Sequence, residues 1–156
     1  MIRPTIITDK PSIFTILRDS NQFDEEGISF VEGILDQHLL EGSSAIWLTA
    51  FEEEPIGVAY CNPEPVSSGV WNLLMLWIRE DKQRLGLGRK LVEQVELNLK
   101  EKGARLLLVE TSSKPMFETA RMFYAKCGFI HEATIRNYFE DGDDKLILTK
   151  LLKDCG

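Results

Sequence analysis

The sequence predicts an α/β fold: a single domain over residues 1–156, built on a mixed, mostly antiparallel sheet flanked by helices on both faces. Strand-like apolar runs alternate with amphipathic helical patterns along the chain. The nearly continuous apolar run 71–78 predicts a strand buried on both faces, and it leads into a glycine-containing turn that opens a helix. Two further strand-like runs surround Asp141-Gly142, a dipeptide typical of hairpin turns.

The first half of the chain is predicted to contain strands and helices in mixed order. Pro11 suits the first turn of a helix, and Gly42 suits the end of another. The acidic run Glu52-Glu53-Glu54 before Pro55 predicts a solvated turn between two strands. The expected elements are a strand over 3–8, helices over 12–19 and 25–40, and strands over 45–51 and 56–61.

The second half continues with a buried strand over 70–78 and a helix over 86–102, which Gly103 ends. A second buried strand is expected over 105–110, followed by a loop over 111–114. Pro115 then opens a helix that Gly128 closes. The last elements are the two strands of a hairpin, 130–139 and 145–152.

The turn between the strand 70–78 and its following helix is the most informative part of the chain. It reads Gln83-Arg84-Leu85-Gly86-Leu87-Gly88-Arg89-Lys90. A turn that opens a helix presents free backbone N–H groups at the positive end of the helix dipole. Gly86 and Gly88 have no Cβ, so an anion can approach the backbone closely. The basic side chains of Arg84, Arg89 and Lys90 add positive charge. The turn is therefore predicted to bind a phosphate or pyrophosphate.

Two familiar phosphate-binding motifs do not fit this turn. A P-loop requires Gly-Lys-Ser or Gly-Lys-Thr, and Gly88 is followed by Arg89. A dinucleotide-binding fingerprint requires a glycine three residues after Gly88, where this chain has Leu91. The pattern that remains is Q-x-x-G-x-G.

A second pattern later in the chain identifies the family that the sequence resembles. The run 120–129 reads A-x-x-F-Y-x-x-x-G-F, carried by Ala120, Phe123, Tyr124, Gly128 and Phe129. Together with Q-x-x-G-x-G, it resembles the GNAT superfamily of acetyl-CoA-dependent N-acetyltransferases. The resemblance extends over essentially the whole chain, because the order of predicted strands and helices also agrees. It implies a GNAT-like fold and the transfer of an acetyl group to a primary amine in a ternary complex.

The resemblance also implies where acetyl-CoA binds. The pyrophosphate is expected on the backbone of Arg84, Leu85, Gly86, Leu87, Gly88 and Arg89. The pantetheine arm is expected on the strand end formed by Leu76, Trp77 and Ile78. A backbone N–H near Ile78 is expected to support the thioester oxygen as negative charge develops on it.

Tyr124 is the candidate acid that protonates the departing thiolate. A tyrosine hydroxyl has a pKa near 10 and can donate a proton at neutral pH. In a helix over 116–127, Tyr124 falls on the same face as Ala120, Phe123 and Cys127. Taken alone, that periodicity favours a core aromatic residue. The match to the family's Phe/Leu-Tyr pair favours catalysis.

Glu110 is the candidate base that deprotonates the acceptor amine. It is the first polar residue after the apolar run 106–109, at the expected end of a buried strand. Relatives that acetylate peptide N-termini place a glutamate at the matching position. Glu80, Asp81 or a chain of water molecules are alternative bases. The alternative role for Glu110 is structural, as a charged residue at a strand end that faces solvent.

The chain departs from the family pattern at one position. The later motif begins with asparagine in the family, and this chain has Phe117 there. Ser112, Ser113 or Lys114 are candidates for the missing contact to the cofactor. In the C-terminal hairpin, Tyr138 matches a family tyrosine that forms a wall of the acceptor groove, and the resemblance implies the same role here.

Composition limits the other function classes. The net charge of −7 disfavours nucleic acid as a partner. The sequence has no run of eighteen apolar residues, so no membrane span is predicted. The N-terminus lacks a signal-peptide pattern, and Cys61, Cys127 and Cys155 lack metal-ligand spacing. We therefore expect a cytoplasmic monomer or homodimer without a metal, whose partners are acetyl-CoA and an amine. A non-catalytic acyl-CoA-binding or sensing module is the alternative function.

Overall fold

A computed structural model describes residues 1–152. These residues form two compact units, each built from segments that are distant in sequence. The first unit combines Met1–Asn62 with Met75–Val95, and the second combines Pro63–Leu74 with the chain from Glu96 onward. The expectation of a single domain stays a prediction. Cys155 lies outside the described residues.

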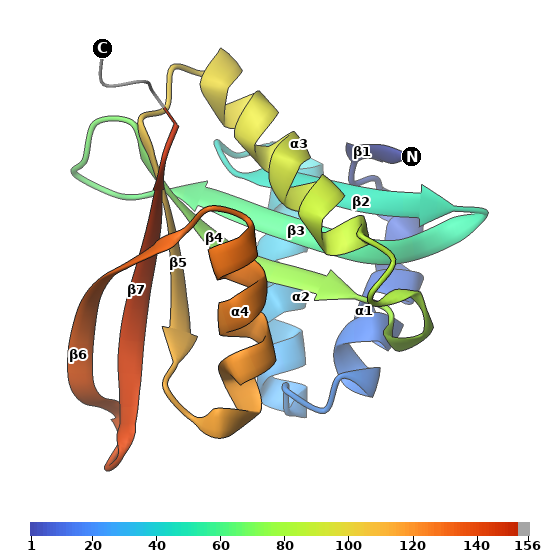
Figure 1. Ribbon diagram of the computed structural model, residues 1–156. Helices are drawn as coiled ribbons and strands as arrows, with labels where there is room; N and C mark the ends of the chain where they lie inside the picture. The colour runs from blue at the N-terminus through green and yellow to red at the C-terminus, as the bar shows by residue number, and fades with distance from the viewer. Residues whose placement is uncertain (153–156) are drawn as a thin grey trace. The chain divides into compact units, whose positions relative to one another are not determined.

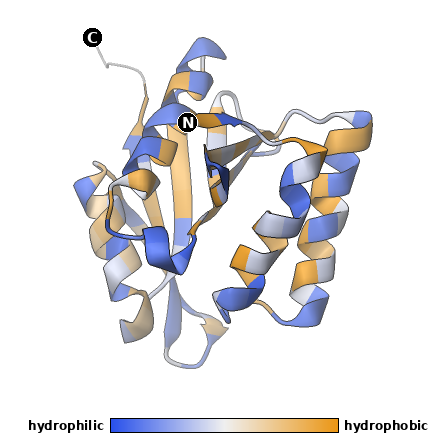
Figure 2. Cartoon of the chain, turned by 90° about the vertical axis from the view of Figure 1, so that its right-hand side faces the viewer, coloured by the Kyte–Doolittle hydropathy of each residue, from blue (hydrophilic) through white to orange (hydrophobic). Residues whose placement is uncertain are grey.

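The first unit contains an antiparallel arrangement of β1 (Ile2–Pro4), β2 (Ile46–Glu52) and β3 (Glu54–Pro63). Helices α1 (Lys10–Asp19) and α2 (Glu25–Glu41) lie side by side, and each carries both hydrophobic and hydrophilic residues along its length (Figure 2). Their apolar faces pack with residues of β2 and β3, so that one buried core joins helices and strands. The fully buried members of this core include Ile13, Leu17, Leu35 and Val58.

The first strand is shorter than the predicted 3–8 because the chain turns at Asp9. The carboxylate of Asp9 accepts hydrogen bonds from the N–H of Ile6 and from the hydroxyl of Thr49, and it forms an ion pair with Arg3 at 2.7 Å. These contacts draw residues Ile7–Asp9 into a turn of 3₁₀ helix immediately before α1. The contacts of this buried, fully paired carboxylate therefore determine the local structure, in place of the strand that the sequence predicted.

The second unit contains β5 (Leu106–Ser112), β6 (Ile130–Glu140), β7 (Asp143–Leu151) and α4 (Glu118–Lys126), with a 3₁₀ turn over Pro115–Phe117 before α4. Strand β7 pairs antiparallel with both β5 and β6, as Figure 1 shows. Gly142 occupies the predicted hairpin turn with φ of +85°. Gly128 follows α4 with φ of +97°, as expected of a residue that ends a helix.

Strand β4 (Val70–Ile78) and helix α3 (Leu87–Glu101) each contribute residues to both units. In the described chain the strand order is β1-β2-β3-β4-β5-β7-β6, with β4 and β5 as the parallel pair. The predicted fold class, a mixed and mostly antiparallel sheet with flanking helices, is therefore confirmed. The ladder between β4 and β5 pairs Val70–Asn72 with Leu106–Leu108.

Two sequence-based expectations about these strands are wrong. The run 71–78 is not buried on both faces, because Leu74 is 48% exposed and Leu76, Trp77 and Ile78 are only half-buried. Strand β5 does not end at Glu110 but continues to Ser112 through two buried residues, because its ladder with β7 extends to the pair Ser112–Lys145. The polar residue Glu110 thus marked neither the end of the strand nor the end of burial.

Candidate active site

The end of β4 and the following loop are joined by the side chain of Gln83. Its amide Nε2 donates a hydrogen bond to the carbonyl oxygen of Ile78 at 3.0 Å. The next residue, Arg79, donates its backbone N–H to the carbonyl of Ile56 in β3. Because successive residues of a strand direct their backbone groups to opposite edges, the N–H of Ile78 points away from β3. The hydrogen bond of Gln83 therefore holds the loop next to the edge of β4 that faces away from β3, which is the edge with the N–H of Ile78.

The loop has an unusual backbone conformation. Arg84 and Gly86 both have positive φ, +66° and +83°, which is common for glycine and rare for other residues. No atom lies within 4 Å of the position that a Cβ on Gly86 would take, so glycine is required there by conformation and not by space. Gly88 is already part of α3. The N–H groups of Leu87, Gly88 and Arg89 precede the hydrogen bond from Lys90 to the carbonyl of Gly86, which begins the helical ladder.

This loop provides free N–H groups, open space over Gly86 and basic side chains at once. The residues from Gln83 to Gly86 are exposed, as are Arg89 and Lys90. Arg89 makes one exposed contact along the helix, with Glu93 at 3.4 Å, which is the kind of ion pair that contributes little energy. The predicted pyrophosphate residues therefore lie together in a site suited to an anion.

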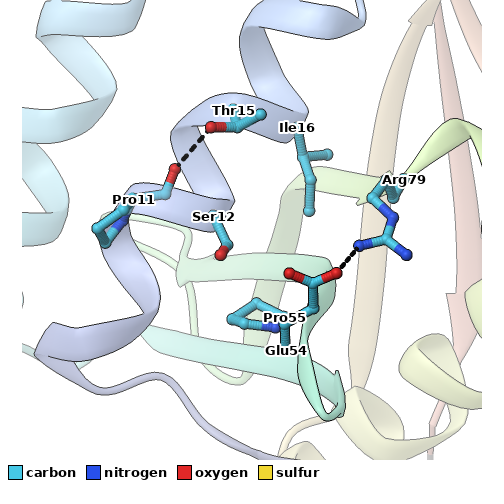
Figure 3. A pocket seen from close by; sticks show the side chains of 7 residues that line it. All are labelled: Pro11, Ser12, Thr15, Ile16, Glu54, Pro55 and Arg79. Carbon is cyan, nitrogen blue, oxygen red and sulfur yellow. Dashed lines mark hydrogen bonds and ion pairs between the residues drawn. The ribbon is translucent and has the colours of Figure 1, made fainter.

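Arg79, by contrast, is fully engaged beside a pocket of the first unit. Its guanidinium contacts Glu54 and Asp81, each at 2.6 Å, and the hydrogen bond from Arg79 lowers the pKa of Asp81. The pocket is lined by Pro11, Ser12, Thr15, Ile16, Glu54, Pro55 and Arg79, and Thr15 donates to the carbonyl of Pro11 within it (Figure 3). None of the predicted site residues lines this pocket. Asp81 is a poor candidate base, because a lowered pKa makes it a weaker acceptor of protons.

Tyr124 lies on α4 among aromatic rings of the second unit. Its ring makes edge contacts with Phe123 at 5.2 Å and with Phe129 at 5.6 Å between centroids. The residue is half-buried, and desolvation, with a smaller contribution from Cys127, raises the pKa of its hydroxyl. No hydrogen bond contributes to this shift. Tyr124 is therefore held by its ring and remains protonated at neutral pH, as a proton donor must be.

Glu110 and Tyr138 are brought together by a residue that sequence reasoning did not select. Lys145, on β7, places its Nζ 2.9 Å from Oε2 of Glu110 and 4.2 Å from the centroid of the Tyr138 ring. The Lys145 side chain is only 13% exposed, and that of Glu110 is 32% exposed. The candidate base and the candidate acceptor wall are thus two contacts of one partly buried ammonium group. The sequence carries no motif that marks Lys145, because the pairing depends on the β5–β7 register.

The three candidates for the missing asparagine contact all bind the β6–β7 hairpin. The hydroxyl of Ser112 contacts Asp143 and accepts from the N–H of Lys114. The Ser113 hydroxyl accepts from the N–H of Asp144 at 2.8 Å, and the ammonium of Lys114 contacts Glu140. These interactions hold the tip of the hairpin next to the end of β5. Each side chain therefore already has a structural role.

The described residues contain no group of histidine, cysteine or acidic side chains arranged to hold a metal ion. The two histidines contact hydroxyl groups instead, His38 with Ser43 and His131 with Thr134. Within residues 1–152, no helix has both the length and the apolar character needed to cross a membrane.

The sequence pattern of the Acetyltransferase (GNAT) family matches residues 10–129 of this chain. No curated protein matches the sequence. Among solved structures, a Desulfovibrio desulfuricans protein assigned to the GNAT acetyltransferases has a TM-score of 0.92 at 25% identity, over 98% of this chain and 99% of that one.

Two more distant structures share the fold. An aminoglycoside 6′-N-acetyltransferase complexed with coenzyme A has a TM-score of 0.82 at 14% identity, over 100% of this chain and 99% of that one. The ribosomal-protein-S18-alanine N-acetyltransferase of Escherichia coli has a TM-score of 0.76 at 22% identity, over 100% of this chain and 96% of that one. Proteins with this fold therefore act on unlike amines, and the fold alone does not select an acceptor.

Proposed function

We propose, because this chain belongs to the Acetyltransferase (GNAT) family, that it transfers the acetyl group of acetyl-CoA to a primary amine. The acceptor is a peptide or protein N-terminus, a lysine or a small-molecule amine. The observation that carries the proposal is the loop after β4, where Gln83 is bonded to Ile78 and Arg84 and Gly86 adopt positive φ. This geometry offers a row of backbone N–H groups to an anion at the start of α3.

The loop suits the pyrophosphate of acetyl-CoA. When it is bound, acetyl-CoA supplies an activated thioester. Arg84, Leu85, Gly86, Leu87, Gly88 and Arg89 are proposed to hold the pyrophosphate. Leu76, Trp77 and Ile78 are proposed to hold the pantetheine amides through their backbone. The direction of the Ile78 N–H, away from β3, supports its use as a hydrogen-bond donor to the thioester oxygen.

The second unit is proposed to supply the proton transfers. The acceptor amine must lose a proton as its nitrogen attacks the carbonyl carbon, and we assign that proton to Glu110, directly or through water. The carbon–sulfur bond then breaks, and the hydroxyl of Tyr124 donates a proton to the departing thiolate. The hydroxyl of Tyr124 enters the reaction protonated, because desolvation raises its pKa. Tyr138 is proposed to line the acceptor groove.

The direct test is release of free thiol from acetyl-CoA in the presence of a panel of amines and peptide N-termini. We expect release that depends on the acceptor and yields an acetylated product by mass spectrometry. Saturable binding of acetyl-CoA with no release on any acceptor would instead support a non-catalytic acyl-CoA-binding module. Calorimetry on the same sample measures the binding step separately from turnover.

A further inference from the structure

We infer that Lys145 is a positioning residue that couples Glu110 to Tyr138 and so sets the acceptor side of the site. The inference rests on the proposed acetyltransferase function, and it adds a residue that neither sequence motif contains. Lys145 begins the regular part of β7, where it pairs with Ser112 of β5 on one side and with Ile135 of β6 on the other. It is therefore located between the strands that carry Glu110 and Tyr138.

The backbone around Tyr138 does not by itself determine where this side chain points. The ladder between β6 and β7 shifts register between His131 and Ala133, runs on to the pair Ile135–Lys145 and resumes only at Glu140–Asp143. Within that gap Asn137 has φ of +56°, outside the strand conformation. The Tyr138 ring is instead held by side-chain contacts, with Lys145 at 4.2 Å and with Phe139 at 5.0 Å between centroids. Lys145 is thus one of two groups that orient the ring.

Lys145 orients the carboxylate of Glu110 in the same way. Glu110 lies within β5, opposite Ile147 of β7. The ladder fixes its backbone but does not select the rotamer of its side chain. The ion pair at 2.9 Å holds Oε2 on the Lys145 side and leaves Oε1 available. Burial alone lowers the pKa of Lys145, but the interactions with Glu110 and Tyr138 outweigh it and the net shift is upward. The group is therefore a permanent cation near neutral pH and does not act as a base.

The chain offers a matched control on the same strand. Lys150 also lies on β7 and pairs with a glutamate, Glu96, at 2.6 Å, while its Nζ donates to the carbonyl of Cys127. Its ion pair involves neither Glu110 nor Tyr138. Loss of the Lys150 charge should therefore lower thermal stability without changing the kinetic constants for the acceptor.

The kinetic test compares Lys145→Met, Lys145→Arg, Glu110→Gln and the Lys145→Met/Glu110→Gln double variant, with Lys150→Met as the control. With acetyl-CoA and the best amine of the panel, Lys145→Met should lower kcat/KM for the amine about tenfold and raise its KM. The Kd of acetyl-CoA should stay within about twofold of wild type. Lys145→Arg should recover most of the loss, because it restores the cation.

Coupling is read from the double variant. If Lys145 acts through Glu110, the Lys145→Met change should cost less than about threefold in a Glu110→Gln background. Fully additive losses, or the same KM change in Lys150→Met, would overturn the inference and leave Lys145 with a structural role.

A second measurement does not require turnover. The ε-methylene protons of Lys145 lie near the face of the Tyr138 ring, so their NMR signals should be shifted upfield in the wild type and return to ordinary values in Tyr138→Leu. Unshifted signals in the wild type would overturn the inference even in an active enzyme. If the wild type transfers no acetyl group to any amine, the proposed function fails. Shifted Lys145 signals in that same protein would still support the coupling of these side chains.

Discussion

Replacing Tyr124 by phenylalanine separates a catalytic hydroxyl from a packing aromatic ring. The substitution removes one oxygen and keeps the ring contacts with Phe123 and Phe129. No hydrogen bond contributes to the pKa shift of the lost hydroxyl, which desolvation dominates. Because a poorly solvated polar group is removed, the free energy of unfolding should be unchanged or rise by up to about 1 kcal/mol. For a chain of this size that is a rise in Tm of at most about 4 °C.

The effect on rate should be far larger. A lost general acid lowers kcat by about 10²–10⁴-fold, which corresponds to about 2.7–5.4 kcal/mol of activation free energy. The Kd of acetyl-CoA should change much less, because the hydroxyl acts as charge develops on sulfur. A donor whose thiol leaves more easily should reduce the loss. The assay is stopped-flow thiol release under conditions where chemistry limits the rate, with Tm measured on the same samples.

The matched control is Phe129→Leu, which removes an aromatic contact of Tyr124 and keeps its hydroxyl. Phe129 is 5% exposed, so this change should lower the free energy of unfolding by about 1 kcal/mol and leave kcat within a few-fold of wild type. A Tyr124→Phe variant with wild-type kcat would refute the acid role and return the residue to the core. A loss of rate matched by Phe129→Leu would refute it equally, since packing would then explain both.

The pKa of Tyr124 adds a test by pH. Because burial raises that pKa in the folded state, its hydroxyl contributes stability that is fully present below the ordinary tyrosine pKa of about 10. Above that pH the unfolded chain ionises first, so stability falls. Phenylalanine cannot ionise, so the advantage of Tyr124→Phe over wild type should grow above about pH 10. An advantage that stays constant with pH would contradict the assigned shift.

Three other predictions concern two glycines and a buried carboxylate. Gly86→Ala should weaken acetyl-CoA binding more than Gly86→Asn does, because asparagine adopts the φ of +83° more readily; equal affinities by calorimetry would contradict this. Gly57→Ala places a Cβ 2.7 Å from Cδ1 of Ile78, a side-chain end that can rotate, and 3.3 Å from the backbone carbonyl oxygen of Trp77; it should lower the free energy of unfolding by about 1 kcal/mol, whereas Gly33→Ala, with no atom within 4 Å, should not lower it. Burial raises the pKa of Asp9, but its hydrogen bonds lower that pKa by more, so the net shift is downward. The contribution of Asp9 to stability is therefore present above about pH 4 and lost below it. Asp9→Asn should cost about 3–5 kcal/mol at pH 7 in a denaturant titration, and progressively less as the pH falls.

Much of the fold followed from local patterns in the sequence. The limits of β4 were predicted at Val70 and Ile78, and the turns at Gly103, Gly128 and Gly142 were predicted from residues that adopt positive φ without strain. These features depend on a few neighbouring residues, and so a single sequence determines them. The loop after β4 belongs to the same class, because Gly86 requires only a local backbone conformation and the start of a helix.

The errors arose where a distant partner determined the local structure. Strand β1 ended early because Asp9 is bound by Thr49, which is 40 residues away in the chain, as well as by the nearby Arg3. Strand β5 continued past Glu110 because β7 offered backbone partners as far as Lys145. A polar residue ends an apolar run in the sequence, but it does not end a strand whose neighbour still supplies hydrogen bonds.

The sequence by itself determined the family, and it indicated a turn suited to an anion and the residue types available for proton transfer, because each of these lies in a contiguous motif. Only the tertiary structure decided what those side chains contact. Gln83 proved to bond to Ile78, and Asp81 proved to be paired with Arg79. The register of β5 and β7 placed Lys145 against Glu110 and Tyr138. Such contacts depend on the pairing of strands that are distant in the chain, and no local propensity encodes that pairing.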